Sequence, residues 1–173
     1  MIFRKATDGD IAAVSRIYDL VHTAEEQSAP TVGWVRGVYP TVDTAQEALK
    51  RDDLFVAEEA GVIVATAIIN HLQPDCYREG NWKFSATEDQ VMVLHTLAVD
   101  PGFSNRGCGT AFVAFYEQYA KDCGCPYLRM DTQIINLPAR SLYQKLGYIE
   151  IGTVPCVFNS IEGVQLVLLE KKL

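Results

Sequence analysis

The feature that most constrains the fold is an apolar run that passes directly into a glycine-rich turn. The run VMVLHTLAV occupies residues 91–99, and the turn GFSNRGCGT occupies residues 102–110. An almost wholly apolar run of this length is typical of a central strand that is covered on both faces. Phe112, Phe115 and Tyr119 then recur at helical spacing. The sequence predicts a strand, a tight turn and a helix in immediate succession.

A glycine-rich turn that opens a helix presents backbone N–H groups to an anion. The first N–H groups of a helix have no partner within it and carry partial positive charge. Gly107 and Gly109 lack a Cβ atom, so a ligand can approach the backbone closely. The turn has neither the Lys-Ser/Thr pair of the nucleotide-triphosphate loop nor the third glycine of the dinucleotide fingerprint. We therefore expect a phosphate-bearing cofactor of another kind.

The remaining patterns predict an α/β chain, with a mixed sheet of about seven strands flanked by about four helices. Strands are expected at residues 2–6, 54–58, 62–70, 91–99, 127–131, 148–154 and 164–170, and helices at residues 11–21, 44–51, 107–122 and 138–146. The stretches 23–42 and 72–90 are expected to be irregular, and a turn is expected at 159–163. We see no repeat or linker, so residues 1–173 are expected to form a single domain.

Composition narrows the classes of partner. A net charge of −7 argues against non-specific nucleic-acid binding, which needs a basic face. The start MIFRKATDGD lacks an apolar signal core, and no run approaches the length of a membrane span, so we expect a cytoplasmic protein that does not bind membranes. The five cysteines are expected to be free thiols. Cys123 and Cys125 form C-x-C rather than the C-x-x-C of zinc sites, so no metal is expected.

Two motifs resemble those of the GNAT superfamily of N-acetyltransferases. LAVDP at residues 97–101, followed by NRGCGT at residues 105–110, is similar to the acyl-CoA motif of that family. The pattern N-x-x-A-x-x-x-Y at residues 136–143, followed by LGY at residues 146–148, is similar to its second motif. The motifs stand in the family's order, separated by one helix and one strand. The resemblance covers residues 91–152 and implies a GNAT-type acyl-CoA transferase fold.

The same resemblance implies acetyl-CoA as the cofactor, lying across a splay between the central strand and the strand that begins at Tyr127. Backbone groups of Leu97 and Val99 would hydrogen-bond the pantetheine arm, and Asn136 would contact that arm or cap its helix. The turn would bind the pyrophosphate through Ser104, Asn105, Arg106, Gly107, Cys108, Gly109 and Thr110. Ser104 replaces the family's Gln or Arg. Asn105 stands where glycine is common, and Asn tolerates left-handed backbone.

The resemblance makes Tyr143 the acid that protonates the leaving CoA thiolate, because a phenol of pKa about 10 suits a thiolate of pKa about 8.5. Core packing is the alternative role for this residue. The acceptor amine also needs a base, and the strand 91–99 contains no carboxylate. His95 is its titratable group, and alternation puts it on the face of Val93 and Leu97. A buried, hydrogen-bonded structural histidine is the alternative role. Asp131, at the end of the next strand and near the acceptor, is a second candidate.

The acceptor pocket is expected from the two irregular stretches, with Trp34, Tyr39, Tyr77 and Trp82 as its wall. Anchoring of the loops to the core is the alternative for these aromatic residues. The leading expectation is transfer of an acetyl group to a primary amine of a small molecule by direct attack. A protein or peptide amine, a non-catalytic acyl-CoA sensor and a nucleotide-binding protein are the alternatives. A homodimer is expected by analogy with the family.

Overall fold

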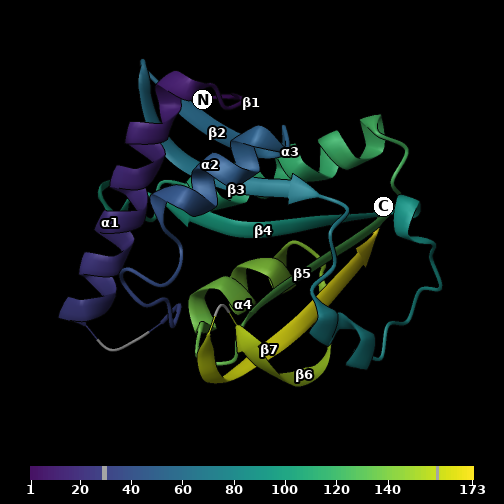
Figure 1. Cartoon of the computed structure of the whole chain (residues 1–173). Helices are drawn as coiled ribbons and strands as arrows, with labels where there is room; N and C mark the ends of the chain where they lie inside the picture. Colours follow the sequence, from purple (N-terminus) through teal and green to yellow (C-terminus); the bar gives the residue numbers. More distant parts are fainter. Residues whose placement is uncertain (29–30, 159) are drawn as a thin grey trace. The chain divides into compact units, whose positions relative to one another are not determined.

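The structure is a computed structural model that describes residues 1–28, 31–158 and 160–173. Residues 29–30 of the predicted irregular stretch, and Asn159 at the start of the predicted turn, lie outside the described residues. Within the described ranges, the seven strands follow the order β1-β2-β3-β4-β5-β7-β6 and are accompanied by four α-helices (Figure 1). The predicted mixed α/β fold with seven strands and four helices is confirmed.

The elements have the following bounds. The strands are β1 (Ile2–Lys5), β2 (Leu54–Glu59), β3 (Val62–Asn70), β4 (Val91–Val99), β5 (Tyr127–Gln133), β6 (Ile149–Phe158) and β7 (Ile161–Lys172). The helices are α1 (Ile11–Gln27), α2 (Val42–Lys50), α3 (Cys108–Asp122) and α4 (Leu137–Lys145), with short 3-10 turns η1 (Asp8–Asp10), η2 (Asp75–Glu79), η3 (Glu88–Gln90) and η4 (Pro101–Phe103). None of the helices in the described part is both long and apolar enough to cross a membrane.

The chain divides into two compact units. Among the described residues, unit 1 comprises 1–28, 34–69 and 95–115, and unit 2 comprises 31–33, 70–94, 116–158 and 160–173. In unit 1, β1 pairs with β2 and β2 with β3, both antiparallel. In unit 2, the first half of β4 pairs with β5 in parallel, whereas β5 and β6 both pair with β7 antiparallel.

In unit 1, alternation along β2 separates two packed faces. Leu54 and Val56 are buried in a cluster with apolar side chains of α1 and α2. Phe55, between them, points to the other face, where its ring centroid lies 5.7 Å from that of Phe115 in α3. Thus α1 and α2 cover one face of the β2–β3 hairpin, and the first half of α3 covers the other (Figure 1). Each fully buried aliphatic or aromatic side chain contributes about 1.5–3 kcal/mol to such a core.

In unit 2, alternation along β5 directs charge to a covered face. Leu128 and Met130 are buried on one side of the strand. Arg129 and Asp131 therefore point to the opposite side, where both contact the segment of residues 71–90. A charged group on a covered face needs a partner or shifts its pKa. The contacts of these two side chains decide what this face can do.

Several boundaries differ from the sequence-based predictions. Helix α1 extends to Gln27 rather than ending near Val21, because residues 23–27 (TAEEQ) contain no helix breaker even though the apolar period has stopped. Helix α2 begins at Val42 with Thr41 as its N-cap, whereas the predicted cap, Thr44, is the third helical residue and completes a capping box with Thr41. The last two strands extend further toward each other than expected, with a register shift between Glu150 and Gly152.

Candidate active site

The start of the glycine-rich turn is fixed by Asp100, which directly follows β4. One carboxylate oxygen accepts the backbone N–H of Gly102 at 2.8 Å, and the other pairs with Arg16 Nη1 of α1 at 2.9 Å. Asp100 is 6% exposed, so the pair is shielded on the aspartate side. The Asp100 N–H also donates to Val64 O of β3 at 2.9 Å. Three contacts therefore hold the chain in place where the turn begins.

The backbone of the turn presents a row of N–H groups at the start of α3. Asn105 and Gly107 both have left-handed backbone, with φ of 60° and 80°. The first helical hydrogen bond is donated by Ala111 N to Gly107 O at 2.9 Å. Among the described residues, no backbone carbonyl accepts from the N–H groups of residues 106–110. Such a row of donors at a helix start fits a diphosphate, so the residues present suit the pyrophosphate of an acyl-CoA.

The side chains of the turn add little that is fixed. Ser104, Asn105 and Arg106 are exposed. The Arg106 guanidinium lies 5.0 Å from the centre of the Phe103 ring, so it stacks on the turn itself. Cys108 is buried, and burial raises the pKa of its thiol, in keeping with a packing role rather than a nucleophilic one. The backbone is therefore the main anion-binding element of this turn.

The second half of β4, in unit 1, departs from a regular strand. Thr96 has a positive φ of 53°, which is rare for a β-branched residue. This left-handed residue interrupts the alternation that the sequence predicts between His95 and Leu97, so their sharing of a face does not follow from strand geometry. His95, Leu97 and Val99 are all half-buried, unlike the fully buried residues at the start of the strand. Their partly open position is compatible with contacts to a ligand.

Aromatic residues of the segment between α1 and α2 pack beside the left-handed residue Thr96. The hydroxyls of Tyr39 and Thr96 share a hydrogen bond. The Trp34 ring lies 6.2 Å from that of Tyr39 and 6.5 Å from that of His22, both in edge contacts. His22 is buried, and its Nε2 lies 3.0 Å from Pro40 O. Two of the predicted wall residues, Trp34 and Tyr39, thus lie together in unit 1.

Asp131 of β5 is the titratable centre of unit 2. Its Oδ2 accepts a hydrogen bond from the Tyr77 hydroxyl at 2.8 Å. Desolvation raises the pKa of this carboxyl to about 6, and the Tyr77 hydrogen bond opposes part of that rise. The residue as a whole is half-buried, and its carboxyl is shielded from water. A carboxyl with such a pKa is ionised at neutral pH and is a stronger base than an ordinary aspartate.

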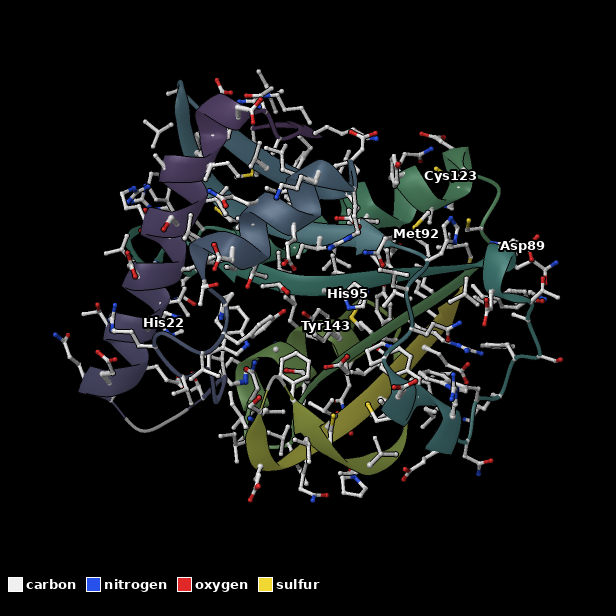
Figure 2. The ribbon with its side chains drawn as sticks, in the orientation of Figure 1. His22, Asp89, Met92, His95, Cys123 and Tyr143 are labelled. Atoms are coloured by element: carbon white, nitrogen blue, oxygen red, sulfur yellow. The ribbon has the colours of Figure 1, made fainter. Side chains whose placement is uncertain are left out.

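Tyr143 lies on α4 in the same unit (Figure 2). It is 6% exposed, and its ring centroid lies 6.0 Å from that of Tyr148. Burial raises the pKa of the Tyr143 phenol, and the negative charge of Asp131 raises it further. The phenol therefore stays protonated at neutral pH, and it interacts electrostatically with Asp131.

The two remaining predicted site residues of unit 2 have clear structural contacts. Asn136 caps α4, since its side chain accepts the Ala139 N–H at 3.2 Å. Trp82 donates its indole N–H to Tyr77 O at 2.8 Å. The Arg129 guanidinium lies 4.0 Å from the centre of the Trp82 ring. Both roles correspond to the alternatives that the sequence left open, a helix cap and a loop anchor.

The predicted site residues thus fall into two groups. Unit 1 contains the turn, the half-buried part of β4 and the pair Trp34 and Tyr39, whereas unit 2 contains Tyr143, Asp131, Tyr77, Trp82 and Asn136. Sequence reasoning missed the hydrogen bond of Tyr77 to Asp131, because the two residues are 54 positions apart. No group of three His, Cys, Asp or Glu side chains in the described part of the chain is arranged to hold a metal ion.

The fold and the turn define an acyltransferase-type α/β protein, and comparison with known proteins gives the family. The acetyltransferase (GNAT) family profile matches residues 14–148, which is more than half of the chain. The chain therefore belongs to the acetyltransferase (GNAT) family. An uncharacterised N-acetyltransferase of Methanocaldococcus jannaschii is 32% identical over 104 residues, which make up 59% of this chain and 42% of that protein. The match thus spans less than half of that relative.

Solved structures confirm the GNAT fold. A GNAT-family acetyltransferase of Streptococcus agalactiae superposes with a TM-score of 0.84 at 22% identity, over 99% of this chain and 95% of that one. A Salmonella typhimurium protein solved with its cofactor acetyl-CoA gives a TM-score of 0.71 at 18% identity, over 99% of this chain and 93% of that one. At these identities the likeness establishes the fold.

Proposed function

We propose that the chain transfers the acetyl group of acetyl-CoA to a primary amine of a small molecule. The observation that carries this proposal is the row of N–H groups at residues 106–110 without backbone acceptors, in a chain of the acetyltransferase (GNAT) family. These groups would hold the pyrophosphate, and Leu97 and Val99 would hold the pantetheine arm through their backbone. The acetyl-CoA that accompanies a neighbour of the same fold supports this choice of cofactor.

The chemistry needs a donor and two proton transfers. When bound, acetyl-CoA supplies an acetyl carbon that the amine nitrogen attacks, so that the N–C bond forms and the C–S bond breaks. Tyr143 would give its hydroxyl proton to the departing sulfur, which its protonated state at neutral pH allows. Either His95 or Asp131 would take the proton that the amine must lose.

The negative charge of the chain and the partly buried aromatic side chains favour a small, cationic acceptor. An amine of ordinary pKa arrives as an ammonium ion, which a shielded carboxylate such as Asp131 attracts. The net charge of −7 favours approach of such a cation through steering. Trp34 and Tyr39 are half-buried and would offer aromatic faces to the acceptor.

Two measurements test the proposal. Calorimetry should show acetyl-CoA binding to the wild-type protein and its loss in Gly109→Val, which would place a branched side chain at the expected pyrophosphate contact. Unchanged acetyl-CoA affinity in a folded Gly109→Val variant would contradict the site. Acetylation of polyamines, aminoglycosides, amino acids and short peptides should be followed by mass spectrometry, because five free cysteines disturb thiol-release assays.

The pattern of acetylated products separates the candidate functions. Acetylation of small amines in preference to peptides supports the proposal. Preference for peptide N-termini or lysines would replace the small-molecule acceptor by a protein acceptor. Tight binding of acetyl-CoA without acetylation of any amine would favour a sensing module.

A further inference from the structure

Asp131 differs from the other shielded carboxylates of the chain in its partners. Asp10, Asp53 and Asp100 are buried, and each forms an ion pair with an arginine at 2.7–2.9 Å. The buried Glu170 accepts the Lys83 N–H at 2.7 Å and interacts electrostatically with Arg129. Within the part of the chain that the structure describes, Asp131 has a hydrogen bond from Tyr77 and no ion pair. Its charge is therefore not neutralised by the protein, as the charge of a structural carboxylate usually is.

Tyr77 is held rigidly, so its hydroxyl has a fixed position. It is 2% exposed and packs in the apolar cluster of unit 2. Its ring lies 5.2 Å from that of Trp82, which also binds the Tyr77 carbonyl. Arg129 stacks on Trp82 and donates to Gln73 Oε1 at 2.6 Å. Arg129 and Asp131 lie on the same face of β5. Arg129 anchors the segment of residues 71–90 through its contacts with that segment, and Asp131 accepts the hydrogen bond of the Tyr77 hydroxyl.

We propose that Tyr77 positions the carboxylate of Asp131 as the group that accepts the proton of the acceptor amine. This inference deepens the proposed acetyl transfer and rests on it. A hydroxyl that occupies Oδ2 leaves Oδ1 as the oxygen available to the acceptor. The rigid tyrosine keeps that oxygen in one orientation, as a proton acceptor requires.

The proton balance is simple. The acceptor reacts as the neutral amine, after its ammonium form has given one proton to solvent. The neutral nitrogen then loses one proton as its bond to the acetyl carbon forms, and Oδ1 of Asp131 gains it. The hydroxyl of Tyr143 supplies the proton that the CoA sulfur needs. After the reaction Asp131 is neutral and Tyr143 is a phenolate, so net transfer of one proton from the first to the second restores the resting state. No oxidant or further reactant is needed.

In the described part of unit 2, Tyr77, Cys76 and Tyr143 interact electrostatically with Asp131. Tyr77 and Cys76 belong to η2, and Tyr143 belongs to α4. Burial raises the pKa of Tyr77 above its ordinary value and that of Cys76 to about 12. Burial likewise raises the pKa of Tyr143. All three are neutral near pH 6, so none of them contributes a titration in that range.

The pH dependence of Tyr77→Phe tests the proposal. In the wild type, kcat/KM for a small amine should rise with pH through a group of pKa about 6. The substitution removes the hydrogen bond that lowers the pKa of Asp131, so this limb should move to higher pH by about 0.5–1 unit. The acceptor amine has a pKa of about 10, so its own deprotonation produces a second, separate rise of kcat/KM at higher pH. An unmoved limb in a folded Tyr77→Phe variant would overturn the positioning role.

Tyr116→Phe is the matched control. Tyr116 is also a fully buried tyrosine, but its hydroxyl donates to Met92 O at 2.6 Å and to Arg129 O at 3.2 Å rather than to Asp131. This variant should lose stability while keeping the acidic limb of the wild type. A shift of equal size in both variants would mean that general loosening of unit 2, rather than the Tyr77 hydroxyl, moves the limb, and would overturn the proposal.

A measurement on the free protein separates this inference from the proposed function. In protein with ¹³C-labelled aspartate carboxyls, the Asp131 resonance, assigned by its absence in Asp131→Asn, should titrate near pH 6 and move to higher pH in Tyr77→Phe. If this holds but no amine is acetylated, the proposed function fails while the Tyr77 contact stands. If amines are acetylated but Asp131→Asn retains full kcat/KM, the proposed function stands and the proton-accepting role of Asp131 is overturned.

Discussion

The turn of unit 1 and the Asp131 group of unit 2 perform their expected tasks with different parts of the chain. The turn offers backbone N–H groups, while its polar side chains Ser104, Asn105 and Arg106 are exposed. The Asp131 group instead depends on the side chains of Tyr77, Asp131 and Tyr143. A backbone site depends on local conformation, whereas a side-chain site depends on contacts between distant residues.

This difference teaches where substitutions should have an effect. In the turn, a new side chain matters when it changes the backbone angles or blocks the approach of an anion. In the Asp131 group, exchange of a single atom changes the chemistry while the shape is kept. The following predictions test this contrast, from the largest expected effect to the smallest.

Asp131→Asn should lower kcat/KM by about 10²- to 10⁴-fold, because an amide cannot accept the proton of the amine. Acetyl-CoA affinity measured by calorimetry should stay within about 2-fold, since the turn is untouched. Asp10→Asn is the control, because that carboxylate pairs with Arg4 at 2.7 Å and should affect stability rather than kcat/KM. Equal losses of activity in the two variants would contradict the contrast between paired and unpaired acids.

Tyr143→Phe should lower kcat by about 10- to 100-fold with little change in acetyl-CoA affinity, because the ring packing is kept and the hydroxyl proton is lost. Steady-state kinetics with a saturating amine would measure it. Tyr148→Phe is the control, because the Tyr148 ring contacts that of Tyr143, and it should keep most of the turnover. Nearly full turnover in Tyr143→Phe would assign this residue to core packing.

Substitutions in the two regions should change stability in opposite directions. The pKa of Asp131 is raised from 3.8 to about 6 on folding, so the ionised carboxylate destabilises the folded state increasingly as pH rises through this window. Asp131→Asn should therefore raise the free energy of unfolding at pH 7 by roughly 1–2 kcal/mol, with no gain below about pH 4. Gly107→Ala, at a φ of 80°, should lower it by about 1–2 kcal/mol. Urea unfolding at several pH values would measure both.

The smallest effects are expected from side chains of the turn. Asn105→Gly keeps a left-handed backbone at a φ of 60° and should change acetyl-CoA affinity by less than about 3-fold. Ser104→Arg adds an exposed cation and should raise affinity by about 2- to 5-fold, an effect that salt should remove. A large loss in either variant would mean that these side chains, rather than the backbone, bind the cofactor.

The same contrast explains how much the sequence could reveal. The strand, turn and start of the helix in residues 91–110 lie next to one another in the chain, so glycine spacing and the apolar run were sufficient to predict this local unit. The left-handed backbone of Asn105 could be anticipated from its residue type, whereas that of Thr96 could not, because β-branched residues disfavour it.

The partners of Asp131 could not be predicted. Alternation on β5 indicated that Arg129 and Asp131 share a face, but not which segment covers it. The irregular stretch 72–90 carries several aromatic residues of similar character. Only the folded structure shows that the Tyr77 hydroxyl donates to the Asp131 carboxylate and that the Arg129 guanidinium stacks on Trp82. The same holds for Asn136, whose type fits both a helix cap and a ligand contact, although its cap is now visible.

The electrostatic interaction of Asp131 with Tyr143 is reciprocal. Because the charge of the carboxylate disfavours ionisation of the phenol, a proton that arrives on the carboxylate makes the phenol a stronger acid. Protonation of one residue and ionisation of the other therefore favour each other, and the pair retains a single negative charge before and after both events. When the carboxylate gains its proton before the phenol gives up its own, this shielded region exchanges two protons without bearing a second unit of charge.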